Sequence, residues 1–164
     1  MSAGVSTRVG IGYDSHRFAP GGPLVLGGVR IPSDVSLVGH SDADAICHAV
    51  TDAVLGAAAA GDIGSLFPDN DEANAGRDSI EMLRTALGSV RALGLSVFNV
   101  DVTVIAEFPR IAPHAPAIRA RLAETLGVPV TSVSVKGKSN ESMGWIGRGE
   151  GIACIAVATL ASER

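Results

Sequence analysis

Hydrophobic residues recur along this chain at two periods, every second residue in some stretches and every three to four residues in others. Strict alternation is typical of half-buried strands, and the longer period is typical of amphipathic helices. These patterns predict strands at residues 9–17, 96–108, 130–138 and 151–160, and helices at 41–60, 78–93 and 113–126. Short apolar runs on both sides of Gly27 and Gly28 predict a β-hairpin with a glycine turn.

Strands and helices alternate in this order, which favours an α+β fold with one mixed sheet. We expect helices to cover one face of that sheet, with the hairpin added beside it. The other face is apolar enough that neighbouring copies of the chain are expected to cover it. The 164 residues suit a single domain over residues 1–164, because no linker, repeat or low-complexity tract interrupts them.

The helix predicted at 41–60 has a polar stripe and a recognisable start. Ser41 is expected to begin the helix, with Asp44 three residues later as its capping-box partner. Asp44, His48, Thr51 and Asp52 follow at helical spacing and should share one polar face. His40, Ser41 and Asp42 would then stand at a helix N-terminus, where backbone N–H groups attract anions.

Asp14 and His16 form a candidate metal site. Alternation along the first strand puts both side chains on one face, and Gly10 and Gly12 on that face are expected to leave it empty. His48 is the natural third ligand, and three ligands would leave one position of a zinc or manganese ion open. Asp44 or Asp52 could orient the imidazole of His48. The alternative is that these are ordinary surface polar residues.

Three other polar segments have two interpretations each. The acidic loop at 61–71 is either an ordinary turn or a site that binds sugar hydroxyls through Asp62. Residues 136–141 are either a solvated strand end or a diphosphate cradle, with Glu141 holding a second divalent cation. Residues 147–151 are either a tight turn or a glycine-flanked phosphate contact made by Arg148.

Composition and charge narrow the classes of partner. The chain is 46% hydrophobic with a net charge of −4 and no basic block, so we expect no nucleic-acid partner. Cys47 and Cys154 form no C-x-x-C motif and are expected to be buried free thiols. No apolar run reaches membrane-spanning length, and residues 1–4 begin no signal-peptide pattern. The expected location is therefore the cytoplasm, with no membrane contact.

Taken together and in this order, the motifs resemble the 2-C-methyl-D-erythritol 2,4-cyclodiphosphate synthase family of the non-mevalonate isoprenoid pathway. The resemblance runs from Arg8 to Leu160. It is carried by residues 12–16, 26–32, 40–44 with 48–52, 61–64 with 66–69, 99–103 and 147–151.

The resemblance implies a homotrimer whose sheets face its centre and whose active sites lie between neighbouring subunits. Asp14, His16 and His48 would bind one zinc ion per subunit, and His40 and Ser139 would stabilise the transition state. The implied enzyme is a metal-dependent phosphorus–oxygen lyase. It would convert 4-diphosphocytidyl-2-C-methyl-D-erythritol 2-phosphate to the cyclic 2,4-diphosphate and release cytidine monophosphate (CMP).

Substrate-binding roles follow from the same resemblance. They fall on Ser41, Asp62, Ile63, Gly64, Phe67, Asp69, Asp71, Ala106, Lys138, Asn140, Glu141 and Arg148, with residues 106–112 beside the cytidine. Glu141 would also reach a magnesium or manganese ion that bridges the diphosphate. Trp145, Arg148 and Glu150 would lie near a central trimer cavity, which in this family can hold an isoprenoid diphosphate.

The chain departs from the usual family pattern in three places, one of which is Trp145, where the family often has Phe. Residues 138–141 read Lys-Ser-Asn-Glu instead of Thr-Thr-Thr-Glu, and residues 106–110 read Ala-Glu-Phe-Pro-Arg instead of Ala-Gln-x-Pro-Lys. Ser139 keeps the hydroxyl, whereas Lys138 changes the charge near the cytidine diphosphate. Two other functions remain as alternatives: a zinc-dependent phosphohydrolase that activates water, and a non-catalytic trimer that binds isoprenoid diphosphates.

Overall fold

The computed structural model describes residues 6–162, so the prediction about residues 1–4 lies outside the described residues. The strands are β1 (Thr7–Pro20), β2 (Leu24–Leu26), β3 (Val29–Ile31), β4 (Val35–Leu37), β5 (Leu95–Ile105), β6 (Val133–Lys138) and β7 (Gly151–Ser162). The helices are α1 (Ala45–Ala57), α2 (Ile63–Leu66), α3 (Ser79–Ala92), α4 (Ala115–Leu126) and α5 (Gly144–Gly147), with 3-10 turns η1 (Glu72–Asn74) and η2 (Val130–Ser132).

The main sheet is mixed, as expected, with the strand order β4-β1-β7-β5-β6. Only β5 and β6 pair in parallel, and α4 connects them. The long central strands β1 and β7 pair antiparallel over eleven residue pairs, from Thr7 opposite Ala161 to Arg17 opposite Gly151. The hairpin β2–β3 forms a separate two-stranded sheet, with Gly27 and Gly28 at its turn in left-handed backbone conformations.

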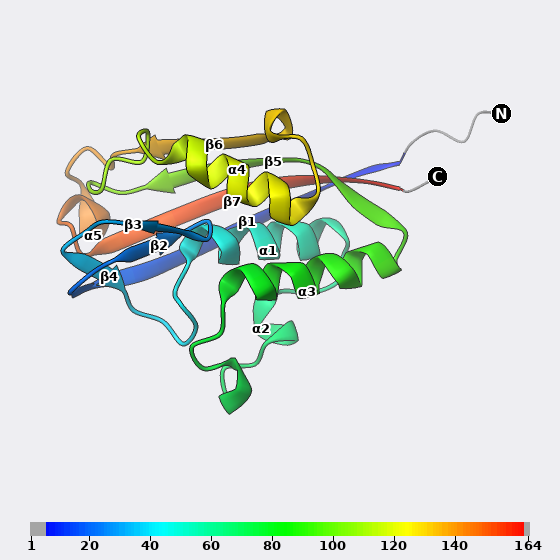
Figure 1. Cartoon of the computed structure of the whole chain (residues 1–164), viewed down its shortest axis with the longest axis horizontal. Helices are drawn as coiled ribbons and strands as arrows, with labels where there is room; N and C mark the ends of the chain where they lie inside the picture. The colour runs from blue at the N-terminus through cyan, green and yellow to red at the C-terminus, as the bar shows by residue number, and fades with distance from the viewer. Residues whose placement is uncertain (1–5, 163–164) are drawn as a thin grey trace.

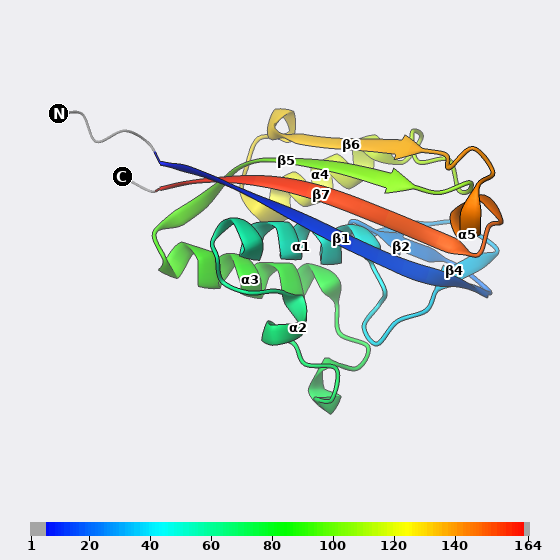
Figure 2. The same cartoon turned by 180° about the vertical axis from the view of Figure 1, so that it is seen from behind.

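The helices α1, α3 and α4 cover one face of this sheet (Figure 1), and the opposite face is bare (Figure 2). Even-numbered residues of β7 from Ile152 to Leu160 point toward the helices and are buried, whereas Val9, Ile11 and Tyr13 of β1 lie on the bare face, each more than half exposed. The sheet thus has a helix-covered face and a partly apolar open face, as the sequence predicts. Among the described helices, none has both the length and the hydrophobicity needed to cross a membrane.

The start of α1 differs from the prediction. The helix begins at Ala45, and Asp44 is its N-cap rather than the partner of a cap at Ser41. The Asp44 side chain accepts a hydrogen bond from the N–H of Cys47. His40, Ser41 and Asp42 therefore lie in the loop before the helix and not at its N-terminus. The helix also ends at Ala57, before the predicted residue 60.

The predicted polar stripe of this helix is wrong at two positions, because Asp44 and Thr51 are fully buried. Thr51 donates its hydroxyl proton to the carbonyl of Cys47, which satisfies it inside the core. Of the predicted stripe only His48 and Asp52 remain partly accessible. Both cysteines are buried and free, as expected, and burial raises the pKa of each thiol.

Other boundaries shift by a few residues. Strand β5 ends at Ile105 rather than 108, and residues 130–132 form a 3-10 turn before β6. The sequence patterns missed the short strand β4, the helical turn α2 inside the acidic loop and the 3-10 turn η1 directly after that loop. The helices predicted at 78–93 and 113–126 are confirmed as α3 and α4. Asp78 is the N-cap of α3, and Gly127 is the left-handed C-cap of α4.

Strand β1 and helix α1 approach each other unusually closely. A Cβ at Gly12 would lie 1.8 Å from the carbonyl oxygen of Ala49, and one at Gly10 would lie 2.1 Å from that of Ala53. The space behind these glycines, which we expected to be empty, is filled by the backbone of α1. The glycines are therefore required because a strand and a helix meet here without side chains between them.

We predict that Gly12→Ala lowers the free energy of unfolding by about 1–3 kcal/mol or more, because its methyl group would overlap the backbone of α1. Gly56→Ala is the matched control, since a Cβ there would meet nothing closer than 3.9 Å. It should stabilise α1 by about 0.5–1 kcal/mol, because alanine restricts the unfolded chain more than glycine does. Thermal unfolding followed by circular dichroism measures both, and equal stability of the two variants would contradict the close approach.

Candidate metal centre

Asp14, His16 and His48 meet in one place, as the sequence predicts. Adjacent strand positions on one face of β1 bring Asp14 and His16 together, and the first turn of α1 brings His48 over them. His16 Nε2 lies 2.7 Å from Asp14 Oδ2, His48 Nδ1 lies 3.2 Å from the same oxygen, and the two ring nitrogens are 3.3 Å apart. Among the described residues, this is the one group of three whose ligand atoms are close enough to hold a metal ion.

The donor set fits zinc. Two nitrogens and one oxygen are usual zinc ligands, and bonds of about 2.0–2.1 Å at tetrahedral angles place donor atoms about 3.3–3.4 Å apart. The distances from His48 Nδ1 to the other two donor atoms, 3.2 and 3.3 Å, are close to that spacing. The distance between His16 Nε2 and Asp14 Oδ2 is shorter, at 2.7 Å, because these two atoms are joined by a direct hydrogen bond. The three residues are half-buried, so a ligand can still reach them.

The remaining nitrogen of His16 fixes how its ring lies. His16 Nδ1 lies 2.8 Å from the carbonyl oxygen of Val38, so this nitrogen carries a proton and Nε2 faces Asp14. Burial by itself would lower the pKa of His16, but the hydrogen bond and the charge of Asp14 outweigh it and raise that pKa. Burial would likewise raise the pKa of Asp14, but the neighbouring imidazoles of His16 and His48 outweigh this effect and lower that pKa.

The surroundings of His48 differ from the sequence prediction. Neither Asp44 nor Asp52 contacts its ring: Asp52 accepts the N–H of Ile63 at 2.7 Å, and Asp44 binds backbone groups. Instead, His48 Nε2 lies 2.9 Å from the hydroxyl oxygens of both Ser41 and Ser79. Sequence reasoning missed Ser79, because it stands 31 residues further along the chain at the start of another helix.

Asp44 has a structural role beside the site. Its carboxylate accepts hydrogen bonds from the N–H groups of Gly27 at 2.8 Å, Gly28 at 2.7 Å and Cys47 at 3.0 Å. Burial raises the pKa of Asp44, and these three donors partly offset that effect. One carboxylate thus joins the hairpin turn to the start of α1, one helical turn before His48.

A cavity of about 310 Å³ opens beside the three candidate ligands. Several residues to which the family resemblance gives catalytic or substrate-binding roles line it together with the triad. They are His40, Ser41, Ile63, Gly64, Phe67 and Asp69. Asp62 and Asp71 do not line this cavity; their side chains cap α2 and η1 by accepting the N–H groups of Ser65 and Ala73.

The loop that forms the far wall of this cavity is held by its own contacts. The guanidinium of Arg77 lies 4.8 Å above the ring of Phe67 and donates to the side-chain oxygen of Asn74 at 3.0 Å. Asn74 in turn donates to the carbonyl of Pro68 at 3.0 Å.

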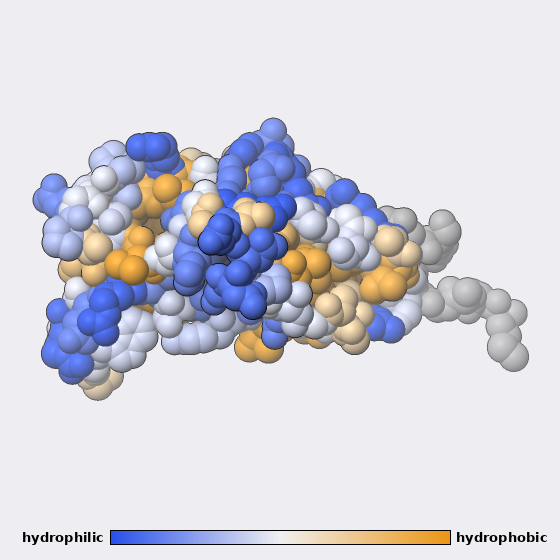
Figure 3. All heavy atoms as spheres, turned by 90° about the horizontal axis from the view of Figure 1, so that it is seen from below, coloured by the Kyte–Doolittle hydropathy of each residue, from blue (hydrophilic) through white to orange (hydrophobic). Residues whose placement is uncertain are grey.

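Seen from the side on which α2 projects, the surface is hydrophilic at its centre and carries apolar residues on both sides (Figure 3).

A separate cavity of about 260 Å³ lies between the loop after β5 and the end of β6. It is lined by residues 106, 107 and 109–112 together with Gly137, Lys138 and Ser139. Glu107 accepts the backbone N–H groups of Asn140 at 2.9 Å and Ser142 at 3.2 Å, and so holds the turn after β6. Glu141 in that turn is exposed, with its carboxylate 3.1 Å from the hydroxyl of Ser139.

The third cavity near the predicted residues has a volume of about 390 Å³ and lies toward the bare sheet face. Ser15, His16, Arg17, Trp145 and Glu150 line it. Arg148 donates to Glu150 at 3.2 Å, and both side chains are largely exposed.

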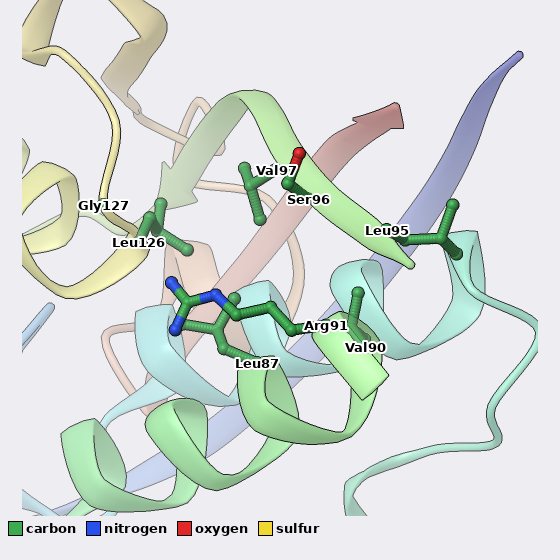
Figure 4. Close-up of a pocket in the computed structure, with 8 residues that line it drawn as sticks. All are labelled: Leu87, Val90, Arg91, Leu95, Ser96, Val97, Leu126 and Gly127. Carbon is green, nitrogen blue, oxygen red and sulfur yellow. The ribbon is translucent and has the colours of Figure 1, made fainter. Parts of the chain in front are cut away.

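One further cavity, of about 230 Å³, contains no predicted site residue. It lies where the end of α3, the start of β5 and the end of α4 meet (Figure 4). Arg91 is its single charged residue, and its guanidinium points toward Leu126 and Gly127 at the end of α4. Apart from this arginine its side chains are apolar or a lone serine, so the cavity offers no general acid, base or metal ligand.

Comparison with known proteins agrees with the geometry. Residues 7–161 match the family model described as the YgbB family. A 2-C-methyl-D-erythritol 2,4-cyclodiphosphate synthase of Gemmatimonas aurantiaca is 62% identical over 153 residues, which cover 93% of this chain and 92% of the relative. The chain belongs to this family. The resemblance inferred from its motifs is confirmed.

Solved structures of the YgbB family's synthases have the same fold. A Plasmodium falciparum structure described as an IspF–CDP complex is 35% identical, with a TM-score of 0.85 over 97% of this chain and 98% of that one. The bifunctional IspDF of Campylobacter jejuni is 37% identical, with a TM-score of 0.93 over 97% of this chain. This chain spans 43% of that longer protein.

The pKa shifts at the triad predict how pH affects two quantities: the stability of the metal-free protein and its affinity for zinc. Without metal, the raised pKa of His16 stabilises the fold below its ordinary value of 6.5, and this contribution is lost as pH rises through the folded pKa. The lowered pKa of Asp14 contributes above its ordinary value of 3.8 and is lost as pH falls through the folded pKa. The pair should therefore stabilise the metal-free protein most between pH 3.8 and 6.5.

Zinc must displace the proton from His16 Nε2, so we expect apparent zinc affinity to fall as pH is lowered through the raised pKa of His16. Competition with a chelator at several pH values measures the zinc affinity. Thermal unfolding of metal-free wild type and of Asp14→Asn at the same pH values measures how much the interaction between Asp14 and His16 stabilises the fold. Zinc affinity that is independent of pH in the range where His16 titrates would contradict a displaced proton.

Proposed function

We propose that this chain converts 4-diphosphocytidyl-2-C-methyl-D-erythritol 2-phosphate to the cyclic 2,4-diphosphate and releases CMP. An oxygen of the 2-phosphate would form a bond to the β-phosphorus while the bond from that phosphorus to the oxygen of CMP breaks. The observation that carries the proposal is the match to named synthases over nearly the whole chain, with the triad assembled as a three-ligand centre. No protein nucleophile is needed for this intramolecular transfer.

Asp14, His16 and His48 are proposed to hold zinc. When bound there, zinc would supply a Lewis acid that neutralises phosphate charge. The neighbouring cavity would hold the methylerythritol part: the backbone at Ile63 and Gly64 supplies polar groups, and Phe67 supplies an apolar wall. Asp62 would act by holding this turn, because its side chain caps α2. His40 and Ser41 at the mouth of the cavity offer donors to a phosphate.

The second cavity is proposed to hold the cytidine diphosphate end, with Ala106 and Lys138 in its wall. Glu141 is proposed to reach the magnesium or manganese ion that bridges the diphosphate, and Asn140 to offer a polar contact. Asp69, which lines the first cavity, would contact the methylerythritol phosphate part instead. The Ser139 hydroxyl would donate to charge that develops on the transferred phosphoryl group. The role of the protein is alignment, which can contribute about 7–11 kcal/mol to lowering the barrier of such a reaction.

We further propose that the chain acts as a homotrimer with shared active sites. Two observations support this assembly. The bare sheet face exposes Val9, Ile11 and Tyr13, which are 67%, 69% and 56% accessible. Ser139 and the triad also line different cavities of one chain, so a neighbouring copy is proposed to bring the two halves together. In that assembly Trp145, Arg148 and Glu150 would face the centre, where Arg148 could meet an isoprenoid diphosphate.

The direct test is CMP release from the proposed substrate in ¹⁸O-labelled water. We expect CMP and the cyclic diphosphate without label, because cyclisation excludes water from the reacting phosphorus. The same assay with His48→Ala should show no turnover and no bound zinc while circular dichroism stays that of the wild type. Label in the released products would favour the phosphohydrolase alternative, and ligand binding without turnover would favour the non-catalytic one.

Ser139 offers a sharper test of the catalytic arrangement. Ser139→Ala should lower turnover by a factor on the order of 10²–10³ or less, because one donor to developing charge is lost. Ser139→Thr should be nearly silent, since it keeps the hydroxyl and restores the usual family residue. Zinc content, measured on both purified variants, should equal that of wild type. The role proposed for Ser139 is wrong if threonine abolishes turnover and alanine does not.

A further inference from the structure

A buried serine connects the proposed ligand His48 to a carboxylate. Ser79 is the first residue of α3 and is fully buried. Its Oγ lies 2.9 Å from His48 Nε2, and its hydroxyl donates to Oδ1 of Asp42. The backbone N–H of Ser79 also donates to Oδ2 of Asp42, at 3.1 Å. This chain of hydrogen bonds lies behind the imidazole, on the side away from Asp14 and His16.

The carboxylate of Asp42 determines the direction of the protons in this series of hydrogen bonds. An ionised carboxylate can only accept hydrogen bonds, so the single hydroxyl proton of Ser79 points to Asp42. The Ser79 oxygen is then left to accept a proton from His48 Nε2. We propose that Ser79 and Asp42 are positioning residues that keep the neutral ring of His48 in the Nε2–H tautomer. In that tautomer Nδ1 presents a lone pair to Asp14 and His16.

This selection matters because the triad itself favours the opposite tautomer. Asp14 Oδ2 lies 3.2 Å from His48 Nδ1, and without a metal that carboxylate attracts a proton to Nδ1. A proton on Nδ1 would occupy the ligand position. Ser41 does not decide between the tautomers, because its oxygen lies 2.9 Å from Nε2 and no carboxylate within residues 6–162 accepts its hydroxyl proton and fixes its direction. The Ser79–Asp42 pair therefore opposes the pull of Asp14.

The backbone around this pair is held by contacts that do not need the Ser79 hydroxyl. Asp42 N–H donates to the carbonyl of Arg77 at 3.2 Å, and Gly76 N–H donates to that of His40 at 2.7 Å. Ser79→Ala should therefore remove the hydroxyl and keep the loop and α3 in place. Ser89→Ala is the matched control, because it makes the same substitution at an exposed serine of the same helix.

The first measurement is the ring ¹⁵N chemical shifts of His48 in metal-free protein, followed from about pH 8 upward until they no longer change with pH, so that the neutral ring is observed. We expect the Nε2–H tautomer in wild type and in Ser89→Ala, and a shift of population to Nδ1–H in Ser79→Ala. Asp42→Asn should shift the population in the same direction. Its amide group can donate to the Ser79 oxygen, so that the Ser79 hydroxyl proton is free to point to His48 Nε2. An unchanged tautomer in Ser79→Ala would overturn the proposal.

The second measurement is zinc affinity by competition with a chelator, since the inference rests on the proposed metal site. Ser79→Ala should bind zinc about 10–100-fold more weakly than wild type, as is typical when a group that orients a metal ligand is lost. Ser89→Ala should match wild type. If wild type binds no zinc, the proposed metal centre is wrong, and the tautomer measurement still tests the role of Ser79. Equal zinc affinity of Ser79→Ala and wild type, or an equal loss in Ser89→Ala, would refute the positioning role.

Discussion

The buried carboxylate of Asp44 is the interaction on which the geometry of the metal centre depends. It accepts the N–H groups of Gly27, Gly28 and Cys47, and so fixes the hairpin turn and the first turn of α1 to the same two oxygens. Hydrogen bonds to a charged group are the stronger ones in proteins, and a buried N–H left without a partner is costly. His48 follows Asp44 by four residues, so its position around the helix axis is set by the same contact.

A second constraint sets the distance between the two elements that supply the ligands. Gly10 and Gly12 of β1 leave no side chain between the strand and α1, and the facing residues Ala49 and Ala53 are small. The backbone of α1 therefore lies directly on the strand that carries Asp14 and His16. A larger residue at either glycine would push α1 outward and move His48 Nδ1 away from Asp14 Oδ2. Stability and ligand geometry thus depend on the same close packing.

Local sequence patterns predicted the features that local chemistry determines. Alternation along β1 was enough to place Asp14 and His16 side by side, and helical spacing was enough to bring His48 into consideration. The role of Asp44 could not be predicted, because an acid three residues after Ser41 has the pattern of a capping box. Two of its three partners are on a hairpin 16 and 17 residues earlier. Ser79 was missed for the same reason, since its contact with His48 depends on how α3 packs.

The contacts divide the proposed site into two parts with different origins. The triad and the groups that orient it come from β1, α1, α3 and the loop before α1, all within one described chain. Ser139 and residues 106, 107 and 109–112 line a different cavity, and the adjoining turn that carries Glu141 is held by Glu107. Under the proposed assembly, zinc binding would therefore be a property of the single subunit. Transfer of the phosphoryl group would depend on the neighbour, because only the neighbour could bring the second part to the first.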